Sequence, residues 1–180
     1  REALPMPTGI SQLELKDYTE ITSPFAISAL PAENALIVEK ELAKKGILVS
    51  SNASAYRMEK NIPLLIPEVN QNHLSLIKEQ DTQGKIITNP NCSTVFLAMG
   101  LAPLVKLGVI KHVSVVTLQA LSGAGYPGVA SMDLLGNIIP NIGGEEQKIS
   151  QEIVKILGQA HESATFETTV HVNRVHVVHG

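Results

Sequence analysis

The sequence has a single cysteine, no tryptophan and only 3% aromatic residues. One cysteine can form neither an internal disulfide nor a zinc site by itself. The net charge is −3 and the Lys and Arg residues are scattered, so no basic stripe is present to bind the phosphates of a nucleic acid. The longest apolar run, residues 95–107, is interrupted by Gly100, Pro103 and Lys106 and is too short to cross a bilayer.

The two ends of the sequence indicate a fragment. It does not begin with Met, no apolar segment typical of a secretory signal follows Arg1, and it stops abruptly at Gly180. A lone thiol fits a reducing cytosol or a plastid-like interior. We therefore expect a cytoplasmic protein, of which these 180 residues form one core, or one complete domain and part of another.

The pattern of apolar residues predicts a βαβ unit after a loop-like stretch of 22 residues. Residues 25–30 and 47–50 are short apolar runs typical of buried strands, whereas residues 32–45 have helical spacing and are followed by Gly46 as a stop signal. Strands that are joined through a helix by short links run parallel. The fold class expected for this part is therefore α/β, a parallel sheet covered by helices.

The later segments predict a mixed architecture. Pro63 favours an edge or irregular strand at residues 62–66, because proline cannot donate a ladder hydrogen bond. The other expected elements are helices at 72–80, 93–107 (a buried helix) and 143–157, and strands at 85–88, 112–120 and 165–178. The second part is therefore α+β, and we place the division between the domains at 1–90 and 91–180.

Cys92 is the first candidate for chemistry, because it follows Asn89-Pro90-Asn91 where a strand meets a helix. The first turn of a helix has unpaired N–H groups and the positive end of the dipole, which favour a thiolate. The same N–H groups can donate to an oxyanion on a carbon bonded to the sulfur. The alternative is a small buried hydrophobic residue, which is common for free cysteines.

The segment around Cys92 and five others resemble motifs of the aspartate-semialdehyde dehydrogenase family. They are residues 89–94 (NPNCST), 51–58 (SNASAYRM), 62–70 (IPLLIPEVN), 119–125 (QALSGAG), 137–148 (NIIPNIGGEEQK) and 173–180 (NRVHVVHG). The resemblance implies a Rossmann-type NADP-binding domain and a catalytic and dimerisation domain like that of glyceraldehyde-3-phosphate dehydrogenase. It also implies a homodimer or homotetramer that makes aspartate β-semialdehyde from aspartyl-β-phosphate with NADPH, releasing phosphate, in lysine, threonine and methionine biosynthesis.

The resemblance assigns roles to individual residues. Cys92 would attack the acyl phosphate and carry a thioester that accepts hydride. Arg57 would bind the phosphate and Arg174 the α-carboxylate, since a planar guanidinium suits both groups. Without the resemblance, an arginine at position 57 is more typical of a solvated loop residue, and Arg174 is also consistent with an exposed cation on an alternating strand. Asn91, within the nucleophile motif, is assigned to substrate binding.

The remaining assignments concern a helical pair and the glycine loop. Glu145 and Lys148 lie on one helix face and would meet the ammonium and the phosphate of the substrate. Glu146 could replace Glu145, and Glu152 with Lys155 has the same spacing but is expected to be a solvated surface pair. Gln119 would be the glutamine that orients the acyl intermediate; the alternative is a polar residue at the end of a strand. Ser122 and Gly123 would contact the nicotinamide end of the cofactor; the alternative is an ordinary glycine turn.

Two family features are expected to lie outside this sequence, so we expect the chain alone not to turn over substrate. They are the glycine-rich phosphate loop and the acid–base histidine, which would follow Gly180. His176 and His179 do not match that histidine, and the others (His73, His112, His161 and His171) are expected to be structural or solvated. Two alternatives stay open: a related reductase of N-acetyl-glutamyl phosphate or malonyl-CoA, and a domain without activity kept for assembly.

Overall fold

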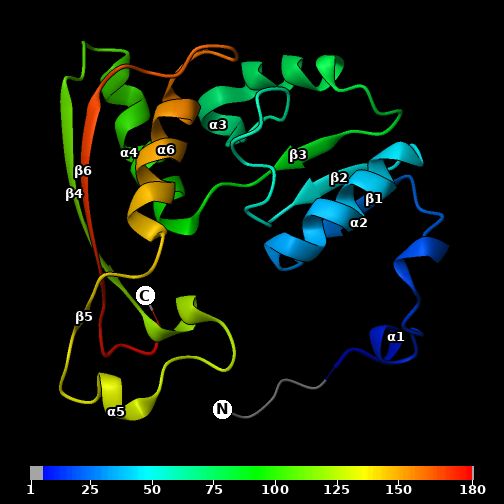
Figure 1. Ribbon diagram of the computed structural model, residues 1–180, viewed down its shortest axis with the longest axis horizontal. Helices are drawn as coiled ribbons and strands as arrows, with labels where there is room; N and C mark the ends of the chain where they lie inside the picture. The colour runs from blue at the N-terminus through cyan, green and yellow to red at the C-terminus, as the bar shows by residue number, and fades with distance from the viewer. Residues whose placement is uncertain (1–5, 180) are drawn as a thin grey trace.

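A computed structural model describes residues 6–179 and contains two three-stranded sheets. In the first, the parallel strands β1 (Phe25–Ser28), β2 (Leu48–Ser51) and β3 (Ile86–Thr88) lie in the order β1-β2-β3. The crossover between β1 and β2 is helix α2 (Ala32–Lys44), which packs against this sheet (Figure 1). The predicted βαβ unit and the α/β class are therefore confirmed.

Burial explains why this unit forms. Leu42 and Ala43 of α2 pack against Val49 and Ile86 of the strands in the first apolar core. The chain turns directly after α2 at Gly46, whose φ of +91° favours glycine. The short turn lets β2 begin at once beside β1, with Ala26 opposite Val49.

The second sheet is built around two long parallel strands, β4 (His112–Gln119) and β6 (Glu167–Arg174). The two-residue strand β5 (Ile139–Pro140) adds antiparallel to β6 and was not predicted. β6 is shorter than the predicted strand 165–178. Beyond Arg174 the chain is no longer paired with β4 but with the turn that follows β4, where the N–H groups of Leu121 and Ser122 donate to the carbonyls of Val177 and Val178.

Helices α4 (Cys92–Val105), α6 (Glu145–Leu157) and α3 (Pro67–Asn70) lie between the two sheets (Figure 1). They enclose a second apolar core that includes Leu64, Ala98 and Ile153. The prediction that α4 is buried was wrong for one face, on which Phe96 is 82% exposed. Because segments from both predicted domains contribute to this core, the division at residue 90 stays a prediction.

The short elements depart most from the sequence prediction. In place of the strand at residues 62–66 there is a single bridge from Leu64 to Thr88, and most of the predicted helix 72–80 is 3₁₀ helix, η2 (Gln71–Glu79). The other short elements are α1 (Thr8–Ser11), η1 (Tyr18–Glu20), η3 (Leu121–Ala124) and α5 (Ser131–Leu134). The first two lie in the stretch that was predicted as loop. In the described part of the chain, no helix has the length and apolar character needed to cross a membrane.

The pair Glu152 and Lys155 is buried, so its prediction as a solvated surface pair was wrong. Their exposed fractions are 2% and 9%. The Lys155 Nζ donates to the backbone carbonyls of Arg57, Glu59 and Ile62, at 2.7, 2.7 and 3.0 Å. These bonds engage all three N–H groups of the ammonium and fix the turn after β2 against α6.

Lys155 should make the unfolding free energy of the whole protein depend on pH in the alkaline range. Burial lowers the pKa of Lys155 to about 8, although Glu59 and Glu152 oppose the shift. Between pH 8 and the ordinary value of 10.5, the unfolded chain keeps a proton that the folded chain has lost. Unfolding free energy should therefore rise with pH across this window, by up to about 1.4 kcal/mol per pH unit relative to Lys155→Met. Urea denaturation of both proteins tests this, and parallel pH curves would contradict it.

Candidate active site

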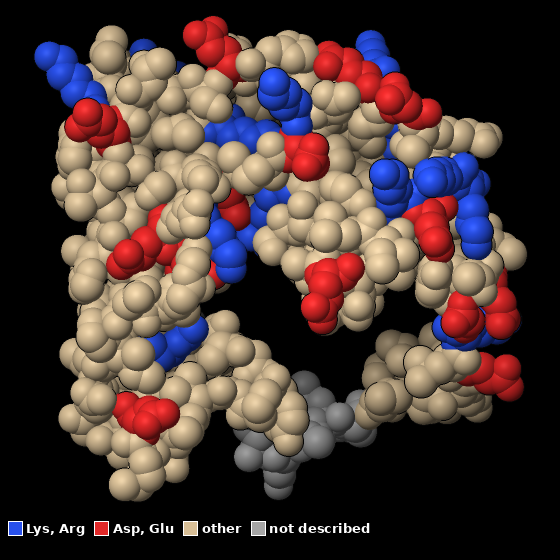
Figure 2. Space-filling model, in the orientation of Figure 1, with Lys and Arg blue, Asp and Glu red and all other residues tan. Residues whose placement is uncertain are grey.

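Three hollows meet at Cys92, at the junction of the two sheets. The largest, a cleft of about 920 Å³, runs along the carboxyl ends of the first sheet: Ala29 follows β1, Asn52 follows β2 and Asn89 follows β3. Figure 2 shows this face of the molecule hollowed, with charged side chains of both signs beside the hollow. The carboxyl ends of parallel strands are where open α/β sheets bind ligands.

Cys92 is the first residue of α4 and is exposed. Asn91 caps this helix, since its side-chain oxygen accepts from the Ser93 N–H at 2.9 Å. The cap fixes the start of the helix, so the thiol lies at the positive end of the α4 dipole. Because Cys92 lines all three hollows, its sulfur is accessible to a reactant in any of them.

The second hollow, of about 400 Å³, collects most of the predicted site residues. Its lining includes Asn91, Cys92, Gln119, Gly123, Glu145 and Arg174. These come from the start of α4, the end of β4, η3, the first turn of α6 and the end of β6. A thiol, two amides, a carboxylate and a guanidinium therefore line one small cavity, although 82 positions separate Cys92 from Arg174.

Arg174 is buried in the wall of this cavity. The alternative that it is an exposed cation on an alternating strand was therefore wrong. Its exposed fraction is 5%, and one Nη1 hydrogen bond goes to the carbonyl of Ala120 at 2.6 Å. A Cβ at position 123 would lie 3.0 Å from the same Nη1, so glycine leaves room for the guanidinium. The other N–H groups of the fork suit a carboxylate.

Glu145 faces the cavity and Glu146 does not. One oxygen of Glu145 accepts from the Asn91 side-chain amide at 2.6 Å, and the other lies 3.1 Å from the Lys148 ammonium. Glu146 instead accepts from the Val172 N–H at 3.2 Å, away from Cys92. Lys148 is partly exposed beside Glu145 and does not line any of the three hollows.

Arg57 borders the large cleft and is not a solvated loop residue. It is 9% exposed, its Nη1 lies 2.9 Å from Glu152, and its Nη2 donates to the carbonyl of Asn52 at 2.9 Å. Its Nε is buried without a hydrogen-bond partner. Since a guanidinium has five N–H donors, donors remain for an anion in the cleft.

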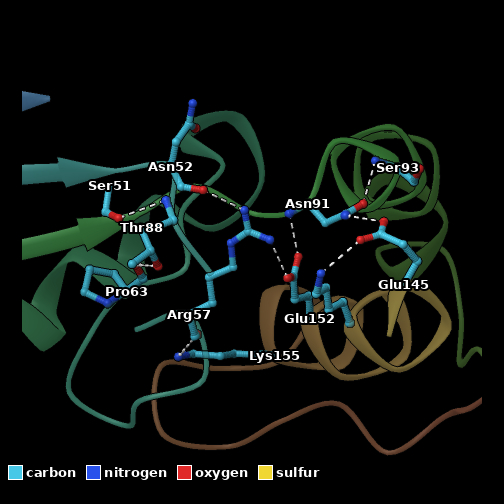
Figure 3. A network of polar contacts seen from close by, with 12 residues as sticks. Ser51, Asn52, Arg57, Pro63, Thr88, Asn91, Ser93, Glu145, Glu152 and Lys155 are labelled. Atoms are coloured by element: carbon cyan, nitrogen blue, oxygen red, sulfur yellow. Dashed lines mark hydrogen bonds and ion pairs between the residues drawn. The ribbon is translucent and has the colours of Figure 1, made fainter. Parts of the chain in front are cut away.

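Glu152 is the residue of this region whose importance sequence reasoning missed. Figure 3 shows that Arg57 and Asn91 both contact its carboxylate; its second oxygen accepts from the Asn91 backbone N–H at 2.6 Å. The sequence did contain a signal that Glu152 is buried: it lies three residues after Ile149 and four before Ile156, and both are fully buried residues of α6. An acidic residue on the core face of a helix needs a partner in the interior.

Ser122 and Gly123 line the third hollow, of about 670 Å³, together with Cys92, Phe96 and the end of β4. This hollow is mainly apolar and continues from the cleft past the thiol, so an apolar ring could lie beside the sulfur. A dinucleotide along the carboxyl ends of β1 to β3 would reach this point, and the residues present fit such a cofactor.

The histidines of the described part lie outside the hollows around Cys92. His73 is fully buried between Asn70 and the Gly158 carbonyl, and burial lowers its pKa. His112, His161 and His171 lie near carboxylates on the surface. Residues 6–179 contain no group of three His, Cys, Asp or Glu side chains suited to a metal ion.

Comparison with known proteins gives matches along nearly the whole chain. A semialdehyde dehydrogenase NAD binding domain matches residues 1–77, and a semialdehyde dehydrogenase dimerisation domain matches residues 101–180. The chain is 45% identical to an aspartate-semialdehyde dehydrogenase of Archaeoglobus fulgidus over 91% of its own length, and 45% identical to that of Methanothermobacter thermautotrophicus over 97%. It spans about half of these relatives, 50% and 53%.

Solved structures agree with this result. The crystal structure of aspartate semialdehyde dehydrogenase with NADP from Candida albicans superposes with a TM-score of 0.86 at 32% identity, over 99% of this chain and 55% of that one. An aspartate semialdehyde dehydrogenase II from Vibrio cholerae, complexed with ASA, gives a TM-score of 0.75 at 26% identity, over 91% and 54%. The predicted fold, a Rossmann-type part followed by an α+β part, is confirmed. The chain belongs to the aspartate-semialdehyde dehydrogenase family.

Proposed function

We propose that the whole protein reduces aspartyl-β-phosphate to aspartate β-semialdehyde with NADPH and releases inorganic phosphate. The observation that carries this proposal is the cavity shared by Cys92, Gln119, Glu145 and Arg174 beside the cleft that Arg57 borders. The identity to aspartate-semialdehyde dehydrogenases over 91% of the chain supports the choice of substrate.

Cys92 forms the covalent bond in the proposed reaction. Its thiolate attacks the acyl carbon, the C–S bond forms, and the C–O bond to phosphate breaks as phosphate leaves toward Arg57. The side-chain amide of Gln119, from the end of β4, donates to the acyl oxygen and orients the thioester. When bound, NADPH supplies the hydride that reduces the acyl carbon. The C–S bond then breaks, and the aldehyde leaves while Cys92 becomes a thiolate again.

Two charged residues of the same cavity select an aspartyl group. Arg174 pairs with the α-carboxylate, and Glu145, which Asn91 holds by a 2.6 Å bond, faces the ammonium. Lys148, whose ammonium lies 3.1 Å from Glu145, neutralises part of the Glu145 charge. A substrate without an ammonium group, such as malonyl-CoA, would give the Glu145 carboxylate no cationic partner inside the cavity, which disfavours it.

We place the cofactor along the carboxyl ends of β1, β2 and β3, with its nicotinamide end at Ser122 and Gly123. Support comes from the cleft and the adjoining apolar hollow, which meet at Cys92. The Candida albicans enzyme, whose structure includes NADP, supports NADP as the dinucleotide.

We also place a second copy of the protein on the outer face of the second sheet. No helix in the described part of the chain covers this face (Figure 1). Exposed and less exposed residues alternate along β4, and two of the exposed ones, Val116 and Leu118, are 69% and 68% exposed. Parallel strands are usually covered on both faces, so this surface suits a homodimer. The dimerisation domain that matches residues 101–180 supports the same partner.

The direct test follows NADP reduction by the whole protein in the presence of aspartate semialdehyde and phosphate. We expect turnover that requires both compounds and falls by at least about 10⁴-fold in Cys92→Ala, because Cys92 is the one thiol in these 180 residues and it lines the cavity. Turnover that persists in Cys92→Ala would contradict the role of the thiol. Wild-type activity with N-acetyl-glutamate semialdehyde alone would contradict the substrate.

Substitution of the two arginines should affect the KM values of different substrates. Arg57→Ala should raise the KM for phosphate and Arg174→Ala the KM for the semialdehyde, each lowering kcat/KM by about a hundredfold, because a buried charge partner is lost. Gln151→Ala, an exposed position on α6, serves as the control and should change neither constant. Equal effects of both arginine variants on both substrates would contradict this division of roles.

A further inference from the structure

A buried pair on α6, Glu152 and Lys155, holds the residue that borders the phosphate side of the cleft. Neither side chain lines the three hollows around Cys92, so neither touches substrate there. We propose that Glu152 and Lys155 are positioning residues that fix Arg57 and the Asn91-Cys92 segment relative to each other. This rests on the proposed function, which makes Arg57 the phosphate ligand.

The Glu152 carboxylate has one partner on each side of the site. Its Oε1 lies 2.9 Å from the Arg57 Nη1, and its Oε2 accepts from the Asn91 N–H at 2.6 Å. With 2% exposure, Glu152 cannot exchange these partners for water without moving. Because Asn91 directly precedes Cys92, a single carboxylate sets where the guanidinium and the nucleophile lie (Figure 3).

Lys155 holds the same arginine by its backbone. Three residues after Glu152 on the same helix, its ammonium donates to the Arg57 carbonyl at 2.7 Å and to two later carbonyls of the turn. Arg57 is therefore fixed at its guanidinium by Glu152 and at its main chain by Lys155. α6 also carries Glu145, so one helix places both the anion site and a substrate-binding carboxylate.

The two bonds of Glu152 can be tested separately. In Glu152→Gln, the amide oxygen can still accept from the Asn91 N–H, but the amide N–H groups would face the donors of Arg57. This variant should disturb Arg57 and leave the Cys92 segment in place. Glu152→Ala removes both acceptors and should disturb both sites.

The measurement is the protection of Cys92 by inorganic phosphate against iodoacetamide in the whole protein, which does not depend on turnover. For Glu152→Gln we expect the unprotected alkylation rate to stay within about twofold of wild type. The half-protecting phosphate concentration should rise about tenfold or more. For Glu152→Ala the rate without phosphate should change as well. Gln151→Ala, at the exposed position that precedes Glu152 on α6, should behave as wild type.

Combination with Arg57→Ala shows whether Glu152 acts through the arginine. Glu152→Gln should add nothing to the weak phosphate protection of Arg57→Ala, whereas independent effects would multiply. Thermal unfolding of each variant checks that the comparison is made on folded protein. If Glu152→Gln stays folded and retains wild-type phosphate protection, the positioning role is overturned. Absence of wild-type turnover with intact phosphate protection would instead overturn the proposed function alone.

Discussion

The carboxylate of Glu152 lies between the Arg57 guanidinium and the backbone N–H of Asn91, at 2.9 and 2.6 Å. It joins three segments that are far apart in the chain: the loop after β2, the start of α4 and the middle of α6. A buried charge is costly unless it is paired, so removal of one partner strains the others. The distance from the Arg57 guanidinium to the segment that carries Cys92 is therefore set in the protein interior, away from solvent.

This arrangement places different chemistry on the two sides of one thiol. On one side, the cleft along the first sheet is lined by strand ends and Arg57, where we propose that the dinucleotide and the phosphate bind. On the other, a smaller cavity is lined by Glu145 and Arg174, where we propose that the charged groups of the amino acid bind. Cys92, at the start of α4, is the point that both share. A thioester formed there would have its acyl group in one hollow and the hydride donor in another.

The sequence predicted the parallel βαβ unit and a helix from residue 93, one residue after the observed start of α4, and six of the residues that it singled out line the small cavity. Local patterns and motifs carry that information. It did not predict that Glu152 and Lys155 are buried, because a charged pair three residues apart is typical of an exposed helix face and Arg57 lies 95 positions away in the chain. The 3₁₀ helix η2 and the lone bridge at Leu64 were missed for a related reason, since tertiary packing overrides local propensity there.

The central claim is that Cys92 forms a covalent acyl intermediate with the aspartyl group held by Glu145 and Arg174. The whole protein, incubated with aspartate semialdehyde and NADP in the absence of phosphate, has no acceptor to release that intermediate rapidly. Mass spectrometry after acid quenching and digestion should find one aspartyl group on the peptide that contains Cys92, and phosphate added before quenching should remove it. Turnover without any adduct on that peptide, or an adduct on another residue, would contradict the account.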